Sequence, residues 1–495
     1  MRKLLIFLIF PFLSFGQVNF TTSNLPIVVI NTNGQTIMDD PRIVCDMGII
    51  YNGVGVMNNV NDPHNEYSGK ISIEYRGSTS QSMFPKKPYA LETQKANGDN
   101  NNVSILGLPS ENDWILYSPY TDKTLMRNVL TFDIGRKMGW YTSRTRYCEL
   151  VVNGDYRGVY VFMEKLKRDN DRIDIAKLDA DDLAGDSLTG GYIVKVDKFT
   201  GTGNWWDYWS SNYSTIGSGN ALKIQYHYPK ADVLFPQQKA YIESYVDSFE
   251  NALSATYFAD TLVGYAKYSD VNSFIDFYII NELAKDIDAY RLSTYMSKDK
   301  SSKGGKLTMG PYWDFNLAFG NADYCDGWLT SGWEVNTSCG DNNPFWFERM
   351  LEDTLYQNKL KCRWEVLRQT TLHKDSLFMF IDDLATVLDS AQQRNFQKWN
   401  IIGVYVWPNY FIGNSYAEEI QNLKTWISGR LNWMDANMPG NCYLQPLFVL
   451  DSQNPVDRKL LKVVDLLGRE FSFQTTQMCI YIYSDGSVER KLFRK

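Results

Sequence analysis

Four oxygen-bearing side chains have the types and spacing of a divalent-metal site. Asp286 and Asp288 lie in the stretch NELAKDIDAYRLSTYM, and Asp314 and Asn316 lie in GPYWDFNLAFGN. Asp314 follows Asp288 by 26 residues, enough for one hairpin or loop that brings the two carboxylates together. Hard cations such as Mg²⁺ take one or two protein carboxylates, with phosphate or water oxygens for the rest. A carboxylate among aromatic residues is costly unless it is paired or holds a metal.

Phosphoryl transfer would be the chemistry of such a site if basic side chains joined it. The reaction needs a divalent ion, a lysine or arginine on the phosphates, and a carboxylate near the attacking hydroxyl. Glu164 could orient one lysine as an ion pair. The basic candidates are Arg76, Lys86, Lys87, Lys123, Arg127 and Lys195.

Each of these residues also has an ordinary structural interpretation. An Asp-x-Asn pattern beside aromatic residues is more often a turn cap or a hydrogen-bonding hub in the core. Lys86 and Lys87 precede Pro88 and fit a solvated turn, and Glu164 with Lys165 fits a surface pair. The residues alone therefore support a divalent-metal hypothesis and leave the phosphate site as one of several alternatives.

Other catalytic chemistries lack their motifs in this chain. The three histidines form no HExxH, and none lies near a GxSxG, which disfavours zinc hydrolases and Ser-His-Asp hydrolases. There is no GxxxxGK[ST] and no GxGxxG that opens a helix. The formal net charge is −7 and no basic block is present, so we expect no nucleic-acid partner.

The elements that must position these residues change along the chain from strands to helices. Strand patterns occupy 26–37, 68–80, 88–93, 146–166 and 190–198, with a helix pattern at 123–140. Helical spacing follows at 236–254, at 271–285 and over most of 344–438, including a helix at 422–438. Asp288 comes after a helix, and Asp314 ends a strand predicted over 305–315. We therefore predict an α+β unit of two lobes.

The N-terminus has the pattern of a secretory signal peptide. Arg2 and Lys3 are followed by an apolar run from Leu4 to Phe12 and then by small residues. The run is too short to span a membrane, and we find no other stretch of that length, so we predict a mature chain without a transmembrane anchor. Export permits disulfides, and Cys325 with Cys339 is the best candidate pair among seven cysteines.

Several blocks of sequence occur in an order that is familiar from one family. The blocks are IEYRGSTSQSMFPKKPYALE, WILYSPYTDKTLMRN, RGVYVFMEKLKRDNDRI, GGYIVKVDK, NELAKDIDAYRLSTYM, GPYWDFNLAFGN and WISGRLNWMDANMPG. Residues 65–440 thereby resemble the CotH family, the spore coat protein H-like atypical kinases. The resemblance implies a divergent protein-kinase-like fold, with a β-rich N-terminal lobe and a helical C-terminal lobe. It also implies phosphate transfer from ATP to Ser or Thr of a partner protein, with Mg²⁺ or Mn²⁺.

The resemblance assigns metal and catalytic roles to three residues. Asp314 matches the metal-binding Asp of the family's Trp-Asp block. Asp288 matches an earlier essential Asp, near the metal or the attacking hydroxyl. Asn316 stands where many members have a second Asp, and its amide oxygen can still bind a metal with one charge less.

The resemblance also assigns residues to the ATP phosphates. Lys87, in the PKK block, resembles a phosphate-facing lysine, and Arg76 belongs to the same loop. Glu164 is the candidate partner of Lys87. Arg127 and Asn128 fall in a family block without an assigned role.

The last fifty residues form short β stretches around a turn at Asp485-Gly486, which predicts a small β module. KVVDLLGRE and IYIYSDGSVERKLFRK resemble a type A sorting domain of the type IX (Por) secretion system of Bacteroidota. With the signal peptide, this implies a secreted or cell-surface protein that the type IX machinery exports. The chain then divides into a signal peptide (1–17), an N-terminal β segment (18–64), a CotH-like kinase domain (65–440) and a sorting domain (446–495).

Two further functions remain open at this stage. The first is a catalytically silent surface binding or adhesion protein on the same scaffold, with a glycan or protein ligand. Its motivation is the aromatic segment GTGNWWDYWSSNY (201–213), which could stack on sugar rings or could be a packed insert. The second is a structural matrix component without a ligand. ATP is scarce outside the cytoplasm, so an exported kinase would act during export, use rare ATP or have lost activity.

Overall fold

The computed structural model describes residues 18–199, 204–336, 339 and 343–442, and three strands within 460–493. The chain divides into two compact units, Met1–Cys442 and Tyr443–Lys495. The predicted signal peptide and the Asp485-Gly486 turn lie outside the described residues.

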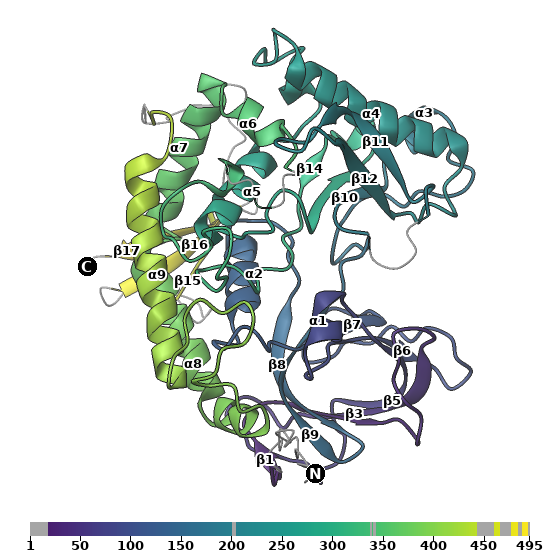
Figure 1. Ribbon diagram of the computed structural model, residues 1–495, viewed down its shortest axis with the longest axis vertical. Coiled ribbons are helices and arrows are strands. Elements are labelled where there is room, and N and C mark those ends of the chain that lie inside the picture. The colour runs from purple at the N-terminus through teal and green to yellow at the C-terminus, as the bar shows by residue number, and fades with distance from the viewer. Residues whose placement is uncertain are drawn as a thin grey trace, which may run out of the picture. The chain divides into compact units, whose positions relative to one another are not determined.

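The N-terminal part of the first unit is a closed barrel of seven strands in the order β2-β3-β5-β6-β7-β9-β8 (Figure 1). The strands are β2 (Ile27–Asn31), β3 (Ile43–Ile50), β5 (Tyr67–Tyr75), β6 (Tyr89–Gln94), β7 (Asp113–Tyr117), β8 (Thr145–Val152) and β9 (Asp155–Glu164). Neighbours are antiparallel except for β2 and β8. Successive side chains of a strand point to opposite faces, and this alternation sends Ile71 and Ile73 of β5 into the barrel core.

A second sheet of five antiparallel strands has the order β11-β12-β10-β13-β14. Its strands are β10 (Tyr192–Val196), β11 (Tyr208–Ser214), β12 (Ala221–Tyr228), β13 (Thr294–Lys298) and β14 (Thr308–Met309). The amphipathic helix α4 (Pro236–Ser254) packs on it through Ile242 and Val246. The pairing of β10 with β13 brings the segment after Val196 close to the chain that precedes Thr294.

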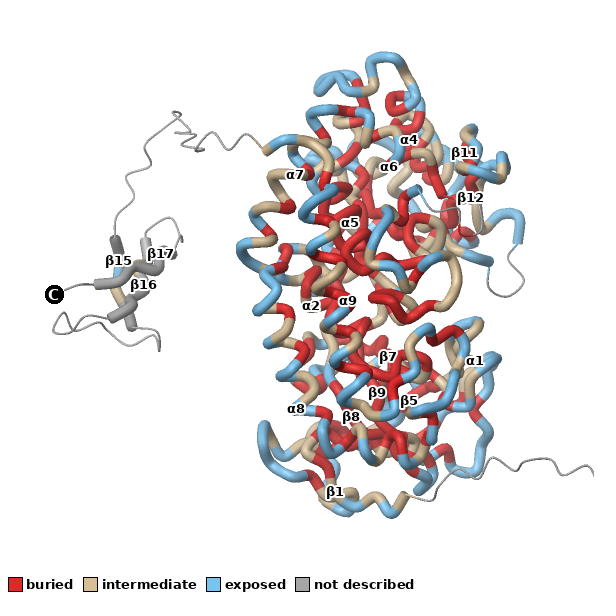
Figure 2. The backbone as a smooth tube through the Cα atoms, turned by 60° about the vertical axis from the view of Figure 1, so that its left-hand side comes forward, coloured by how far each residue is buried: buried red, intermediate tan, exposed pale blue. Residues whose placement is uncertain are grey.

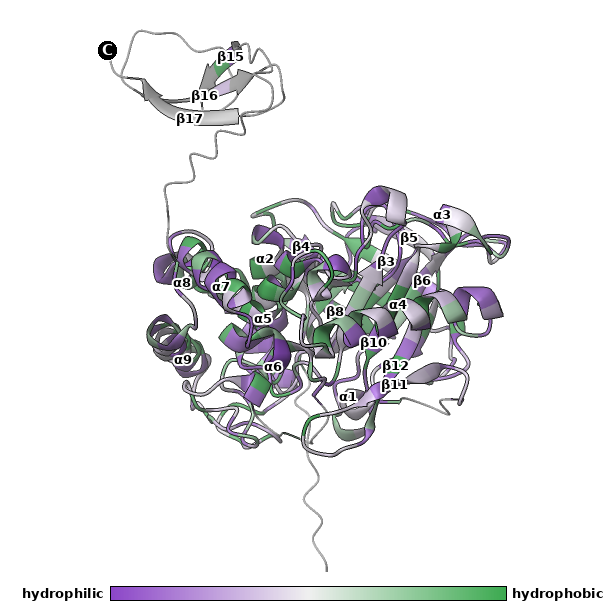
Figure 3. Ribbon diagram, turned by 90° about the horizontal axis from the view of Figure 1, so that it is seen from above, coloured by the Kyte–Doolittle hydropathy of each residue, from purple (hydrophilic) through white to green (hydrophobic). Residues whose placement is uncertain are grey.

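Helices make up most of the C-terminal part of the unit. They are α2 (Arg127–Lys137), α5 (Val271–Ala284), α6 (Trp346–Met350), α7 (Thr354–Arg368), α8 (Lys374–Lys398) and α9 (Tyr416–Asn437), with short helices α1 (Thr79–Met83) and α3 (Gly185–Leu188). Figure 3 shows both hydrophobic and hydrophilic residues along α7 and α8, as expected of surface helices.

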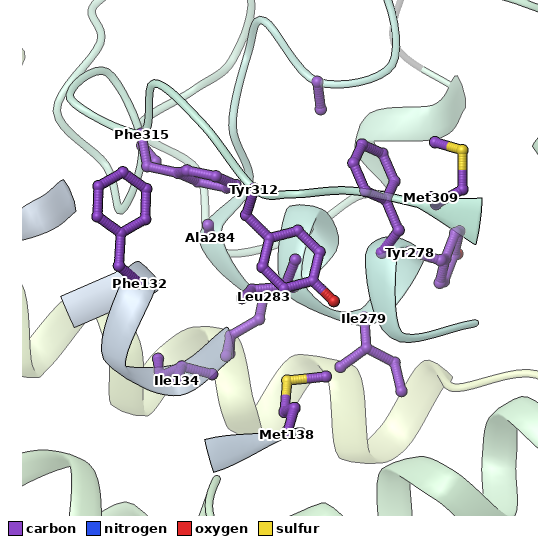
Figure 4. Close-up of a cluster of buried hydrophobic side chains, with 14 of the residues drawn as sticks. Phe132, Ile134, Met138, Tyr278, Ile279, Leu283, Ala284, Met309, Tyr312 and Phe315 are labelled. Atoms are coloured by element: carbon purple, nitrogen blue, oxygen red, sulfur yellow. The ribbon is translucent and has the colours of Figure 1, made fainter. Parts of the chain in front are cut away.

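Helix α5 forms the centre of the core, because it is almost wholly buried (Figure 2). Its buried carboxylates Asp276 and Glu282 pair with arginines of the neighbouring helices α7 and α9. Figure 4 shows Ile279 and Leu283 of α5 near Ile134 of α2 and near Met138, which follows α2. Helix α5 ends where Lys285 adopts a left-handed conformation, with φ of 43°. This turn directs the next residues, including Asp286 and Asp288, away from the helix axis.

The mixed α+β class predicted from the sequence is confirmed, with strands first and helices later. The strand predicted over 305–315 is shorter than expected and ends at Met309. Gly310, with φ of 107°, and Pro311, which has no N–H to donate, stop the pairing there. The helix predicted over 422–438 begins earlier, at Tyr416, because Ser415 accepts a hydrogen bond from the Glu418 N–H and caps it.

Two disulfides lie in the described part of the first unit. The predicted Cys325–Cys339 pair is confirmed, and Cys362 of α7 also bonds to Cys442. The second unit holds an antiparallel sheet of β15 (Leu460–Asp465), β16 (Gln477–Tyr483) and β17 (Val488–Phe493). Within the described ranges, no helix has the length and apolar character needed to cross a membrane.

Candidate functional site

The carboxylate of Asp314 is not buried among the aromatic residues that surround it in sequence. Tyr312 and Phe315 point into the core and are each 1% exposed (Figure 4), whereas the Asp314 side chain is exposed to solvent. Its backbone is left-handed, with φ of 70°. That conformation costs a non-glycine residue on the order of 1–3 kcal/mol and is concentrated at functional sites. The sequence expectation of an apolar setting is therefore corrected: the loop turns this one side chain outward.

The first two residues of α2 hold the loop that carries Asp314. The side-chain oxygen of Asn128 accepts a hydrogen bond of 2.6 Å from the Phe315 N–H. The Arg127 Nε donates to the Ala318 carbonyl at 3.0 Å. These two residues, which the sequence left without a role, fix the loop on either side of Asn316.

Asp314 and Asn316 line a partly open cavity of about 120 Å³ together with Arg76. Apolar walls come from the barrel, α2 and the α1 loop: Phe84, Pro88, Ile115, Tyr117, Phe132 and Met163. The volume is below the range of about 300–1,000 Å³ that is usual for small-molecule sites, so a larger ligand would extend beyond the cavity.

Arg76 and Asp314 face this cavity without partners. In the described part of the chain, the Arg76 guanidinium makes no hydrogen bond or ion pair, and its contact is the Trp313 ring, with the centroid 5.6 Å away. The Asp314 carboxylate likewise accepts no hydrogen bond there. Burial lowers the pKa of Arg76, and the charges of Tyr295 and Asp314 act in the opposite direction. An unpaired cation and an unpaired carboxylate in one cavity are groups left available for a ligand.

Further carboxylates lie within electrostatic range of Asp314. The crowding of protein atoms raises the pKa of Asp314 to about 6, and the charges of Asp288 and Asp197 add to this, while Lys198 opposes it. The pKa of Asp286 is raised well above its usual range by burial and by the charges of Asp288 and Asp314. The structure thus brings Asp288 and Asp314 within electrostatic range of each other.

Asp288 itself is held in place by a neighbouring arginine. The Arg291 guanidinium lies 2.7 Å from the Asp288 carboxylate and also donates to the Ile287 carbonyl. Burial raises the pKa of Asp288, and the Arg291 charge lowers it. Asp288 is partly exposed, so solvent can reach it.

The donor set suits a hard cation held by few protein ligands. Among the described residues, no three His, Cys, Asp or Glu side chains converge on one ion. Mg²⁺ needs only one or two carboxylates when phosphate and water complete its shell. The Asp314 carboxylate and the Asn316 amide line the same cavity, and the surplus of negative charge around them is one that a cation would balance.

Two residues that the sequence assigned to the phosphates have other contacts. The Lys87 Nζ donates to the Gln81 carbonyl at the end of the α1 turn. Glu164 is fully buried and accepts from the Arg144 guanidinium at 2.7 Å and from the Arg144 N–H at 2.9 Å. The expected Lys87–Glu164 pair is therefore wrong, because Arg144 occupies the Glu164 carboxylate.

Lys86 lines the cavity, but its ammonium points elsewhere. It donates to the Val159 carbonyl at 2.6 Å and to the Asn395 side chain at 2.8 Å, which joins the barrel to α8. Burial lowers the pKa of Lys86 well below its usual value. The remaining basic candidates are also engaged: Lys123 with the Val404 carbonyl, Arg127 with Asp122, and Lys195 with Asp197.

Sequence reasoning missed three charged residues of this region. Asp197 and Lys198 follow β10, and Arg291 follows Asp288 by three residues. The first two stand in the GGYIVKVDK block that carried the resemblance. The signal that identifies Asp314, a carboxylate just past the end of a strand, also applies to Asp197.

The described residues thus combine, in an α+β protein, an arginine without a polar partner and a carboxylate on one cavity, with further carboxylates within electrostatic range. Residues 73–434 match the family described as CotH kinase protein. The match spans more than half of the chain, so the chain belongs to the CotH family. No curated protein matches it.

Proposed function

We propose that this protein is an exported CotH-like atypical kinase that transfers the γ-phosphate of ATP to Ser or Thr of a partner protein with Mg²⁺ or Mn²⁺. The observation that carries the proposal is the pair of unpartnered charges, Arg76 and Asp314, on the walls of one cavity. Family membership supports it. In this proposal, the barrel and the helical part correspond to the two lobes of a divergent protein-kinase-like fold, with the cavity where they meet.

The cavity has one apolar and one polar region, which suits a nucleotide. The apolar walls around Ile115 and Met163 would contact the base, and Arg76 would bind the phosphates. Asp314 and Asn316 would hold the divalent ion. When bound, that ion would neutralise charge on the phosphates. Most of the rate gain would come from positioning and electrostatics.

Asp288 would position the acceptor hydroxyl or complete the metal site. Its partial exposure leaves it accessible, and its ion pair with Arg291 would fix its orientation. Lys87 and Glu164 would support the site indirectly. Lys87 bonds to α1, which lies beside Arg76 in the chain, and Glu164, at the end of β9, holds Arg144 just before β8.

We also propose that the mature protein is secreted or displayed at the cell surface. The signal-peptide pattern of residues 1–17 and the sorting-domain resemblance of residues 446–495 support export through the type IX machinery. Two disulfides in the first unit also suit an oxidising compartment. Fractionation of cells that express the chain with and without residues 446–495 tests this, because loss of the sorting domain should leave the protein in the periplasm.

A silent binding protein is the second candidate function. Trp205 is 78% exposed and Trp206 is 41% exposed, which favours a surface that contacts a ligand over a packed insert. Binding to a glycan array without nucleotide binding would support this alternative.

Thermal melting of the full chain with and without Mg·ATP tests the leading proposal. A ligand that binds only the folded state raises Tm by mass action. We expect a rise in the wild type that is lost in Asp314→Asn and reduced in Arg76→Ala, and that persists in the control Asp39→Asn, an exposed carboxylate on the barrel. The same rise in Asp314→Asn, or none in a folded wild type, would contradict the proposal.

A further inference from the structure

Two adjoining cavities form a polar groove along the barrel, which we name the amide groove. The first has a volume of about 650 Å³ and is lined by the β6–β7 connection, by residues 167–169 after β9, by Lys177 and by Tyr228 of β12. The second, of about 540 Å³, is lined mainly by residues of β2, β3, β5 and β6. Lys95 and Asn101 line both cavities. Each volume is usual for a small-molecule site, and two neighbouring cavities suit a ligand made of repeated units.

Side-chain amides make up a large part of the first cavity. They belong to Asn100, Asn101, Asn102 and Asn112. Each amide has two N–H donors and an acceptor oxygen, and each sugar hydroxyl likewise both donates and accepts. An ionised phosphate or sulfate group has acceptor oxygens only, so it would leave the amide oxygens without donors. The lining therefore favours a ligand that is rich in hydroxyl groups.

Asn112 is a buried polar residue whose side chain has no partner. It is 3% exposed, and its backbone N–H donates to the Glu111 carboxylate at 2.7 Å. Among the described residues, no group bonds to its side-chain amide, which lies in the wall of the first cavity. Nearly all buried polar groups of folded proteins are hydrogen-bonded, so an exception calls for an explanation. A hydroxyl of a bound ligand would provide the missing partner.

The unpaired charges of the first cavity are mostly positive. The Lys95 side chain makes no hydrogen bond or ion pair in the described part of the chain, and Arg168 donates there to neutral oxygens and to no carboxylate. Lys167 and Lys177, in contrast, are each paired with a carboxylate. Asp169 is the one carboxylate of this lining that forms no ion pair with a described residue. Two cations and one carboxylate are thus left for a ligand.

The surroundings of Tyr228 agree with this excess of positive charge. Burial raises the pKa of its hydroxyl. The charges of Arg168, Lys177 and Lys167 lower that pKa, and the charge of Asp179 raises it. Three cations and one carboxylate therefore act on the same point of the cavity wall, so an anionic group of a ligand would be attracted to it.

We propose that the amide groove binds an acidic oligosaccharide, which is a chain of sugar units that carries carboxylate groups. The sugar hydroxyls would pair with the asparagine amides, and a carboxylate would bind to Lys95 or Arg168. Hydrogen bonds between charged groups are roughly twice as strong as neutral ones, so the carboxylate would give much of the selectivity. This binding does not rest on the proposed kinase function, and it uses a different site from the exposed Trp205 and Trp206.

Isothermal titration calorimetry with the full chain tests the binding. The probes are oligomers of galacturonic, glucuronic and mannuronic acid, the carboxyl-reduced neutral form of each, and a phosphoserine peptide. We expect at least one acidic oligomer to bind about tenfold more tightly than its neutral form, with an affinity that falls as salt screens the charges. Binding of no oligomer, equal binding of the acidic and neutral forms, or binding of the phosphoserine peptide alone would overturn the proposal.

Two variants of the groove locate the ligand. Asn112→Ala should lower the affinity for the acidic oligomer about tenfold, because it removes an amide that only the ligand would bond. Lys95→Gln should lower it about threefold. It changes an exposed side chain without contacts in the described chain, which covers the case in which Asn112→Ala does not fold. The control Trp205→Ala, which removes an exposed ring outside the groove, should retain the affinity. Unchanged affinity in both groove variants, or an equal loss in Trp205→Ala, would refute the assignment.

Melting curves separate this site from the proposed kinase site, because no described residue lines both the amide groove and the cavity of Arg76 and Asp314. The acidic oligomer should raise Tm equally in the wild type and in Asp314→Asn, and Mg·ATP should raise it equally in the wild type and in Asn112→Ala. Loss of the oligomer's effect in Asp314→Asn would place the ligand in the other cavity and contradict the proposal. A chain that binds the oligomer but not Mg·ATP would contradict the kinase proposal and support this one.

Discussion

Two arginine–aspartate combinations near the same loop differ in whether their charges meet. Arg127 and Asp122 are buried and form an ion pair of 2.5 Å, and the Arg127 N–H also donates to the Asp122 carboxylate at 2.8 Å. Arg76 and Asp314 line one cavity but form no such pair. Arg127 and Asp122 form a closed pair, because their charged groups bond to each other. Arg76 and Asp314 form an open pair, because their charged groups stay available for a ligand.

Both combinations consist of an arginine and an aspartate, so residue type alone does not tell a charge that stabilises the fold from one that binds a ligand. The contacts of the charged groups make that distinction. Breaking a buried pair leaves an uncompensated charge, which is strongly destabilising. Removing one member of an open pair breaks no existing ion pair, so the stability of the fold should hardly change. The effect of the substitution should instead appear in ligand binding. The following variants test this division, from the largest expected effect to the smallest.

Arg127→Ala should lower the free energy of unfolding by about 3–5 kcal/mol, because Asp122 would remain buried without its cation. Urea unfolding of the full chain measures this. Arg76→Ala is the matched control and should stay within about 0.5 kcal/mol of the wild type. An equal decrease in the free energy of unfolding in Arg127→Ala and Arg76→Ala would show that the two pairs do not differ in their structural role.

Asp314→Asn should reduce phosphate transfer by about 10²–10³-fold, the usual effect of removing one group that stabilises the transition state. Transfer of radiolabelled phosphate from ATP to serine and threonine peptides measures it. Its stability should not fall, because the Asp314 side chain is exposed and accepts no hydrogen bond in the described chain. An active Asp314→Asn protein would exclude the assigned role.

Glu250 of α4 provides a third case, a buried carboxyl bonded only to neutral donors. Ser211 and Trp346 donate to it at 2.6 and 2.8 Å, yet burial raises its pKa from 4.5 to about 7. The pKa of Glu250 is higher in the folded protein than in the unfolded chain, so the folded state favours the neutral carboxyl. The stabilisation by this neutral carboxyl, relative to the charged one, is fully present below about pH 4.5 and is lost as pH rises through about 7.

In Glu250→Gln, this pH dependence should vanish. Between pH 4.5 and 7, the wild type should lose about 3 kcal/mol relative to the variant, at 1.36 kcal/mol per pKa unit. Unfolding curves at several pH values compare the two proteins. A wild type whose stability relative to Glu250→Gln is flat across this range would show that Glu250 stays charged.

Asn128→Ala should cost about 1–3 kcal/mol, because the buried Phe315 N–H loses its acceptor. Phosphate transfer should fall as well, since this bond holds the loop of Asp314. Asn414→Ala, which removes an exposed amide, is the control for the amide itself. A transfer rate that stays normal in a destabilised Asn128→Ala protein would show that the loop keeps its shape without the bond.

The sequence predicted the parts of the fold that depend on local pattern. Alternation located β5 and β6, periodicity located α4 and α5, and the Asn153-Gly154 turn located the β8–β9 hairpin. The closure of the barrel was not predicted, because it depends on the parallel pairing of β2 with β8, more than a hundred residues apart in the chain. Local pattern carries no information on such a partner.

Site residues could be predicted where their position in the local sequence marked them. They could not be predicted where their role depends on contacts with residues that are distant in the chain. Carboxylates at the ends of elements indicated Asp288 and Asp314, which the structure brings within electrostatic range. Lys87 resembled a phosphate-binding lysine, but which of several cations stays unpaired depends on distant acceptors. Asn395 of α8 engages Lys86, and Arg144 engages Glu164, and neither partner is visible from the local sequence.

The Cys362–Cys442 disulfide has a mechanical consequence for a protein made of two units. Cys442 is the last residue of the first unit, and its bond ties it to α7, 80 residues earlier. Tension applied beyond Cys442 therefore reaches the first unit by two covalent routes, through the backbone to the end of α9 and through the disulfide to α7. A pull on this end of the first unit is shared between two helices, so the end of α9 does not bear it alone.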